Sequence, residues 1–154
     1  MSRLIEDLND ETERLARHFL LEAHDAGLNV AVTSTLRTRE IQVAYFAQGR
    51  ATLEVVNLLR KIAGLKPIAQ DANLVITKCD GVNSKSKHQE GDAFDVVLLN
   101  KYGDPIWHVA TCFVDYKSLG KIGMANGLEW GGSWAPLDPS TGIGWDAFHY
   151  ERRV

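Results

Sequence analysis

The spacing of apolar residues changes along the chain, and this change limits the possible folds more than any other feature. Helical spacing predicts helices over residues 10–26, 38–48, 51–64 and 111–126. Valine-rich or alternating runs predict strands over residues 28–34, 73–78 and 93–100, with 93–109 forming a hairpin that returns through IWHVA. The tail after residue 127 is aromatic and glycine-rich, with little periodicity. Helices that precede most of the strands favour an α+β fold, in which helices pack on a small antiparallel sheet.

The bulk properties predict one soluble domain that spans residues 1–154. No linker, repeat or low-complexity tract marks a boundary, and 45% hydrophobic with 24% charged residues is typical of globular proteins. A net charge of -3 argues against nucleic acid as a partner. No apolar run reaches the roughly 20 residues that a bilayer requires, so we expect no membrane insertion. The charged first residues lack a secretory signal, which predicts that the protein stays in the cytoplasm on synthesis.

Histidines and acids are the available metal ligands, because the two cysteines, Cys79 and Cys112, give neither a disulfide framework nor a cysteine-based zinc site. His18 and His24 are six residues apart, a spacing that does not place them on one helix face, and we expect both to be solvated. His108 lies in IWHVA and is interpreted as structural. The two remaining histidines lie among acids and small residues.

The first of these segments is SKHQEGDAFD, residues 86–95. Gly91 can bend the chain after His88, and Asp95 begins the apolar strand, where it could turn toward the same point as His88. A carboxylate that enters a strand interior needs a partner, and a metal ion would be one. A hydrogen-bonded or surface position is the ordinary alternative.

The second segment is WDAFHYE, residues 145–151. Asp146 precedes His149 by three residues, so a single helical or 3₁₀ turn would place both side chains on one side. One residue could then bind a metal while the other reaches a water molecule. Each segment alone is ambiguous, and the two together favour a site.

These motifs resemble those of the M15 zinc peptidases, a family of VanX- and VanY-like D,D-peptidases and phage L-alanyl-D-glutamate endopeptidases. The family pattern Ser-x-His-x-x-Gly-x-Ala-x-Asp is met without exception, at Ser86, His88, Gly91, Ala93 and Asp95. The second pattern, an acid three residues before a histidine, is met by Asp146 and His149. It follows Trp-Gly-Gly-x-Trp at residues 130–134, as in endolysin members.

A third and weaker match is TSTLRTREIQ, which aligns Arg37 and Gln42 with the family's Thr-Ser-Gly-Tyr-Arg-Ser…Gln. Thr35 and Leu36 replace the usual glycine and aromatic residue, which puts the local turn in question. Arg39 is a rival for the role of the arginine. The resemblance runs from roughly residue 30 to 151 and implies the Hedgehog/DD-peptidase-like form of the α+β fold.

The resemblance also implies a role for each matched residue. His88, Asp95 and His149 would be the ligands of one Zn²⁺ per chain, and a three-ligand site leaves a position open for water. Asp146 would be the general base, and Arg37 would stabilise the oxyanion. A looser assignment gives Ser86, Gln42 and Trp130 substrate contacts or contacts to a ligand.

Other polar and aromatic residues near the motifs receive no catalytic role. Glu90 and Asp92 occupy variable positions and are expected to be solvated, and Glu151 is interpreted as a surface residue rather than a partner of a ligand. Five aromatic residues either wall a peptide groove or belong to the core: Trp130, Trp134, Trp145, Phe148 and Tyr150.

The implied substrate is the peptidoglycan stem peptide, and the endolysin-like features favour cleavage between L-alanine and D-glutamate, leading to lysis of the host. A bacteriophage lysin would accumulate in the host cytoplasm and reach the wall after holin-mediated release. It would act as a monomer without a separate wall-binding domain. The alternatives are a D-alanyl-D-alanine carboxypeptidase or dipeptidase, a non-catalytic zinc-stabilised wall-binding domain, and a virion-associated wall-penetrating component.

Overall fold

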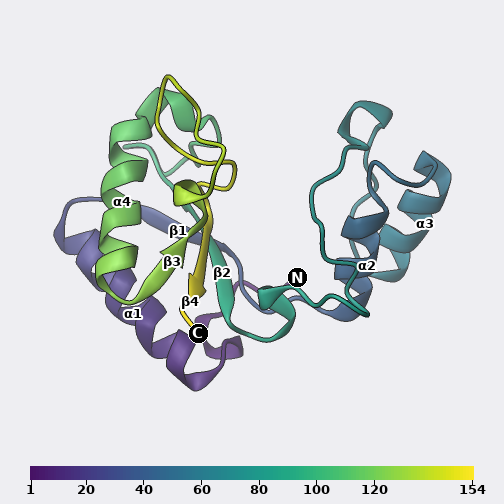
Figure 1. Cartoon of the computed structure of the whole chain (residues 1–154), viewed down its shortest axis with the longest axis horizontal. Helices are drawn as coiled ribbons and strands as arrows, with labels where there is room; N and C mark the ends of the chain where they lie inside the picture. The colour runs from purple at the N-terminus through teal and green to yellow at the C-terminus, as the bar shows by residue number, and fades with distance from the viewer.

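A four-stranded antiparallel sheet forms the centre of the larger lobe of the molecule (Figure 1). The computed structural model describes residues 1–154. The strands are β1 (Val30–Ser34), β2 (Ala93–Leu98), β3 (Leu128–Trp130) and β4 (His149–Arg152). Their order is β1-β2-β4-β3, so the last strand of the sequence lies inside the sheet, between β2 and β3. The α+β prediction is therefore confirmed.

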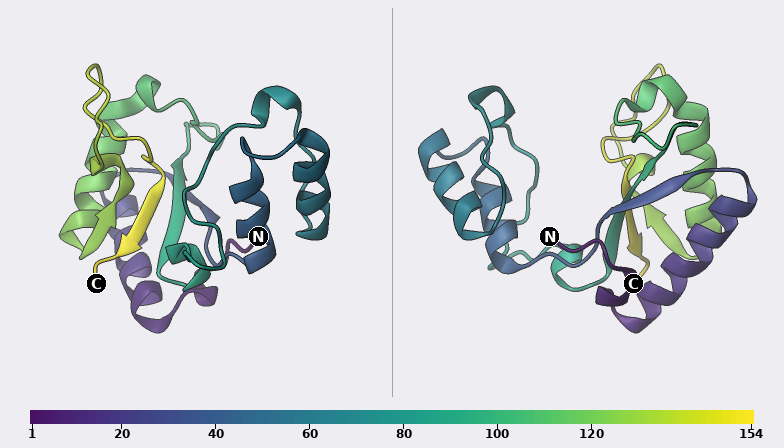
Figure 2. Two further views of the ribbon diagram at one scale, coloured as in Figure 1. Left: turned by 45° about the vertical axis from the view of Figure 1, so that its right-hand side comes forward. Right: turned by 180° about the vertical axis from the view of Figure 1, so that it is seen from behind.

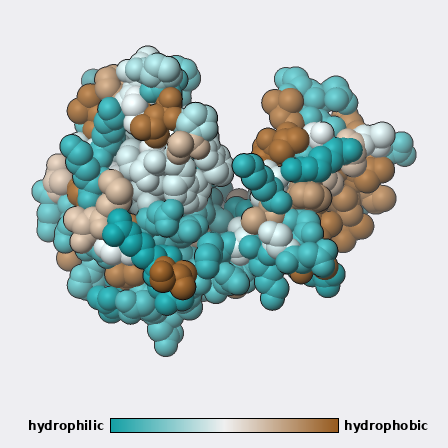
Figure 3. Space-filling view, viewed as in Figure 1, coloured by the Kyte–Doolittle hydropathy of each residue, from teal (hydrophilic) through white to brown (hydrophobic).

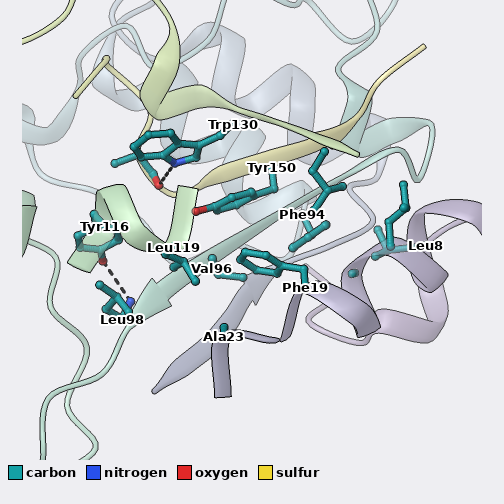
Figure 4. Packing of buried hydrophobic residues seen from close by; sticks show 14 of the residues in the cluster. Leu8, Phe19, Ala23, Phe94, Val96, Leu98, Tyr116, Leu119, Trp130 and Tyr150 are labelled. Atoms are coloured by element: carbon teal, nitrogen blue, oxygen red, sulfur yellow. Dashed lines mark hydrogen bonds between the residues drawn. The ribbon is translucent and has the colours of Figure 1, made fainter. Parts of the chain in front are cut away.

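Helices α1 (Asp10–Asp25) and α4 (Phe113–Ala125) cover one face of this sheet. The helix α1 begins where the Asn9 side chain accepts a hydrogen bond from the Thr12 amide, and three acids in its first turn favour the positive helix end. Phe19 of α1 packs against Phe94 of β2 and Tyr150 of β4 (Figure 4). These contacts pack the strands against the helical layer. The opposite face of the sheet, the free face, is not covered by α1 or α4.

Helices α2 (Arg39–Ala47) and α3 (Leu53–Ile62) form a smaller lobe that lies beside the sheet rather than on it (Figure 2). Thr38 and Thr52 cap these helices, each accepting a hydrogen bond from an amide three residues later. Apolar side chains of α3 remain exposed on the outside of this lobe, where Figure 3 shows a hydrophobic surface. The lobe faces the free side of the sheet across a notch (Figure 3).

Short 3₁₀ segments connect the larger elements. They are Ile5–Asp7, Gln70–Ala72, Lys87–Gln89, Val109–Cys112 and Gly131–Ser133. None of the helices has the length and apolar character needed to cross a membrane.

Two strand predictions are wrong. Residues 73–78 form no strand, because they run along the small lobe, where no sheet edge is available to pair with them. Three of their apolar side chains are at least half exposed, those of Leu74, Val75 and Ile76. The predicted hairpin also fails, since residues 105–109 make a single bridge to Leu99 and β2 pairs with β1 and β4 instead. The tail, for which no strand was predicted, supplies β3 and β4.

Candidate active site and metal centre

Two neighbouring strands place acidic and histidine side chains on the free face of the sheet. Alternate residues of β2, namely Phe94, Val96 and Leu98, belong to the core, so Asp95 points to the opposite face. In β4 the same alternation buries Tyr150 and turns His149 and Glu151 toward the free face. Asp95 and His149 are direct partners in the antiparallel register, which brings their side chains together.

His88 lies in a short 3₁₀ segment, Lys87–Gln89, and its side chain lies next to those of Asp95 and His149. Ser86 caps this segment by accepting a hydrogen bond from the His88 amide at 3.3 Å, and the side chain of Gln89 accepts one from the Ser86 amide at 3.0 Å. Gly91 then turns the chain into β2 with φ of +72°. Ser86 thus helps to position His88.

Three donor atoms meet in a nearly equilateral triangle: His88 Nε2, Asp95 Oδ1 and His149 Nδ1. Each pair of these atoms is separated by 3.3 Å. Tetrahedral ligands that lie about 2.0 Å from a zinc ion are separated from one another by about 3.3 Å. The spacing of the three donor atoms therefore fits ligands of one tetrahedrally coordinated metal ion.

The second nitrogen of each histidine is held by a neighbour, which leaves the first free to face the triangle. His88 Nδ1 lies 2.8 Å from the Thr35 carbonyl oxygen, so this nitrogen carries the proton and donates it. His149 Nε2 lies 2.8 Å from Glu151 Oε2. Carbonyl or carboxylate partners of this kind orient metal-binding histidines. The prediction that Glu151 is a surface residue is wrong, because its side chain is only 17% exposed and contacts His149.

The electrostatic environment favours positive charge at the triangle. Burial alone would raise the pKa of Asp95, but His88 and His149 hold it well below its usual range. Burial likewise opposes the charged form of His149, yet hydrogen bonds to Asp95 and Glu151 raise its pKa to about 9. The charge of Asp95 within the triangle and that of Glu151 behind His149 therefore both favour a cation there.

Asp146 reaches the same cleft from the turn that precedes β4. The turn closes with a hydrogen bond from the His149 amide to the Asp146 carbonyl oxygen, and it is a turn between coil and strand rather than a helical one. Burial raises the pKa of the Asp146 carboxyl, an effect that His149 partly offsets. A carboxyl with a raised pKa beside a metal centre is suited to proton transfer.

Gly131 and Gly132 of the Trp-Gly-Gly-x-Trp motif allow the close packing behind this turn. A methyl group on Gly131 would overlap the Asp146 carbonyl oxygen and lie 3.2 Å from His149 Cβ. A methyl group on Gly132 would overlap the Trp130 ring. Trp130 itself lies in the core, outside the cleft, and its indole N–H donates to the Ala147 carbonyl oxygen at 2.9 Å (Figure 4). Its contact therefore holds the turn, and the ring does not reach a substrate.

Arg37 lies at the edge of the triangle, with Nη2 3.9 Å from Asp95 Oδ2. Its Nη1 donates to Gln42 Oε1 at 2.9 Å, and its guanidinium lies 5.0 Å from the centre of the Tyr45 ring. Gln42 is buried and donates in turn to the Cys79 carbonyl oxygen. Burial lowers the pKa of Arg37, while Asp95 raises it. Arg39, the rival in the sequence, is exposed and outside the cleft.

The cleft around these residues has a volume of about 480 Å³. The large lobe contributes aromatic rings, namely Trp107, Trp134, Trp145 and Phe148. Trp134 also lies 5.2 Å from the His149 ring. Tyr150, the other aromatic considered for the groove, is in the core.

The remaining predictions for polar residues have mixed outcomes. Four of these residues are exposed and lie outside the cleft, namely His18, His24, His108 and Glu90. Both cysteines are unpaired. Asp92 is not solvated, contrary to expectation. It is 7% exposed, accepts a hydrogen bond from Asn9 and pairs with Arg152 at 3.2 Å, an arrangement that joins β4 to the start of α1.

Comparison with known proteins finds one family model that matches part of the chain and several solved structures with a similar fold. Residues 80–151 match a model of the M15 peptidase family that is described as D-alanyl-D-alanine carboxypeptidase. No curated protein sequence matches the chain.

Solved structures with low sequence identity share the fold. The L-Ala D-Glu endopeptidase ChiX of Serratia marcescens is 17% identical with a TM-score of 0.55, covering 97% of this chain and 83% of that one. The vancomycin-resistance D,D-pentapeptidase VanY, in complex with Zn(II), is 18% identical with a TM-score of 0.57, covering 94% and 72%. The LD-carboxypeptidase LdcB is 16% identical with a TM-score of 0.54, covering 94% and 58%.

The match over residues 80–151 and the His-Asp-His cluster support a metallopeptidase. The family model over residues 80–151 and the shared fold support a relationship to the M15 peptidase family.

Proposed function

We propose that this protein is a zinc-dependent endopeptidase that hydrolyses the L-alanyl-D-glutamate bond of the peptidoglycan stem peptide. The observation that carries the proposal is the 3.3 Å triangle of His88, Asp95 and His149, with Asp146 and Arg37 beside it in one cleft. The likeness to the Serratia endopeptidase supports the choice of bond.

In this proposal His88, Asp95 and His149 hold one Zn²⁺ per chain. When bound, zinc supplies Lewis-acid chemistry that polarises a carbonyl group and lowers the pKa of water. Thr35 and Glu151 keep the two imidazole rings in the orientation that binding requires.

Asp146 acts as the general base and acid of the reaction. Its carboxylate removes the proton of the attacking water and later delivers that proton to the leaving amine. The raised pKa of Asp146 brings its basicity closer to neutral pH. Arg37, held by Gln42, supplies positive charge to the oxygen of the scissile carbonyl as negative charge develops on it.

A phage endolysin is the biological role that we propose for this activity. The protein would then be made in the host cytoplasm, reach the wall through holin-mediated release and act as a monomer. The Trp-Gly-Gly-x-Trp motif, met at Trp130 and Trp134, supports this role.

The second candidate is a D-alanyl-D-alanine carboxypeptidase or dipeptidase, which the description of the matching family model favours. Digestion of purified muropeptides followed by mass spectrometry separates the two candidates. Endopeptidase action releases the stem peptide after L-alanine, whereas the alternative shortens the peptide at its carboxyl end. A zinc-bound protein that cleaves neither bond would instead favour a non-catalytic wall-binding domain. Activity that survives His149→Ala would refute the zinc mechanism.

A further inference from the structure

The cleft is lined by basic as well as aromatic side chains. Apart from Arg37 and the acids of the metal centre, the charged side chains that line the cleft are Lys78, Lys85 and Lys87. Lys87 pairs with Glu90 at 3.4 Å, whereas no acidic partner lies within ion-pair distance of Lys78 or Lys85. This concentration of positive charge is notable in a chain whose net charge is -3.

Several hydrogen bonds fix the backbone of the loop before Lys85. Asp80 Oδ1 accepts hydrogen bonds from the amides of Val82, Asn83 and Ser84 at 2.8 to 2.9 Å. These bonds hold the pKa of Asp80 down at about 2. The Gln89 side chain donates to the Gly81 carbonyl oxygen at 3.1 Å. The loop therefore presents its lysine from a fixed backbone, which lowers the entropic cost of binding.

The segment that carries Lys78 is fixed in a similar way. Gln42 donates to the carbonyl oxygen of Cys79 at 2.8 Å and to Thr77 Oγ1 at 3.1 Å. The same Gln42 accepts from Arg37, so one buried amide positions both the arginine and the backbone beside Lys78. Lys78 and Lys85 thus flank the catalytic cleft on elements tied to the site.

We propose that Lys78 and Lys85 bind a carboxylate of an acidic peptide substrate and so select stem peptides in which that carboxylate is free. The inference rests on the proposed function and deepens it. In a stem peptide the D-glutamate is linked through its γ-carboxyl group, which leaves its α-carboxylate beside the L-alanyl-D-glutamate bond. Two unpaired ammonium groups at the wall of the cleft match an anion at that position.

The test uses three acetylated Ala-γ-D-Glu-Lys peptides that differ only in where a carboxylate is free. The first has the free α-carboxylate of D-glutamate and a C-terminal amide, the second has amides at both positions, and the third has only a free C-terminal carboxylate. Binding is measured by calorimetry with zinc-loaded Asp146→Asn protein, so that no peptide is cleaved. Cleavage rates of the same peptides are measured with the wild-type protein.

We expect the first peptide to bind about tenfold more tightly than the doubly amidated one, with a preference that weakens at high salt. Adding Lys78→Gln and Lys85→Gln should remove this preference and leave the affinity for the doubly amidated peptide unchanged. The matched control is Lys61→Gln with Lys66→Gln, which removes the same charge from exposed positions outside the cleft. This control should keep the preference.

Equal binding of all three peptides would overturn the inference, as would a preference that survives both lysine substitutions. A lysine-dependent preference for the third peptide would support carboxylate binding but assign it to the chain terminus, as in a carboxypeptidase. Failure of the wild-type protein to cleave any peptide, with the binding preference intact, would refute the proposed function and not this inference.

Discussion

At the scale of single residues, replacing Asp146 tests whether metal binding and proton transfer depend on different side chains. It lies in the cleft beside the triangle but is not one of the three residues whose donor atoms meet there. We expect Asp146→Asn to retain zinc, because the triangle is intact, and to lower kcat by about 10² to 10⁴-fold, since the proton acceptor is lost. Metal analysis and steady-state kinetics on the same preparation check both points. Loss of zinc from the variant would make Asp146 a ligand.

Glu151 offers a second test at this scale, because it contacts the metal centre only through His149. We expect Glu151→Ala to weaken zinc binding by about 10 to 100-fold, since His149 loses the partner that orients its ring. Glu151→Gln keeps an acceptor for the same hydrogen bond and should recover part of the loss. Competition with a fluorescent chelator measures the affinity.

The matched control for this substitution is Glu54→Gln, which removes a carboxylate from an exposed position on α3. It should leave zinc affinity unchanged. Zinc binding in Glu151→Ala as tight as in the wild-type protein would show that the 2.8 Å contact has no part in holding the metal.

The sequence motifs predicted which side chains meet in the cleft, but not the contacts behind them. His88, Asp95, His149, Asp146 and Arg37 all line it, as their motifs indicated. Glu151 follows His149 by two residues, and residues two apart in a strand lie on the same face of the sheet. The sequence therefore contained the information that these two side chains are neighbours. The partner of His88 is a backbone carbonyl group. Every residue has such a group, so the residue types in the sequence could not predict this contact.

At the scale of elements, the turn from residue 146 to 149 depends on the glycine behind it. We expect Gly131→Ala to lower kcat/KM by about 100-fold, because the added methyl group overlaps the Asp146 carbonyl oxygen and displaces the turn. Gly103→Ala is the control, since it has a positive φ of +87° but no atom within 4 Å of the added methyl group. It should lower thermal stability without changing kcat/KM. Wild-type kinetics in Gly131→Ala would show that the turn tolerates the displacement.

Helices were predicted more accurately than strands, for a physical reason. Helical hydrogen bonds are local, so periodicity and caps such as Thr38 and Thr52 place the boundaries within a few residues. A strand needs a partner, and the apolar run at 73–78 has none. The strands β3 and β4 are short and polar in part, and they exist because neighbouring strands offer edges to them.

At the scale of the whole molecule, metal binding should couple to stability, because the three proposed ligands come from β2, β4 and the segment before β2. We expect a chelator to abolish peptide hydrolysis. Free zinc at 1,000 times its Kd would stabilise the fold by about 4 kcal/mol. Removing it should therefore lower Tm by about 10 °C.

Thermal unfolding with and without zinc measures this shift, and His149→Ala, which lacks one ligand, should show almost none. Hydrolysis that continues after complete removal of the metal would exclude a metal-dependent mechanism. A zinc-dependent shift of the same size in His149→Ala would place the binding site elsewhere.

The position of β4 inside the sheet has a consequence for how the site arises during folding. His88 and His149 are 61 positions apart in the sequence, and β4 must pair with β2 before their rings can meet. Pairing over such separations is slow relative to helix formation, because the entropy of loop closure is lost before the contact contributes any stabilising free energy. Recovery of hydrolysis after dilution from denaturant should therefore lag behind recovery of helical circular dichroism, so that enzymatic activity reports the completion of the native topology.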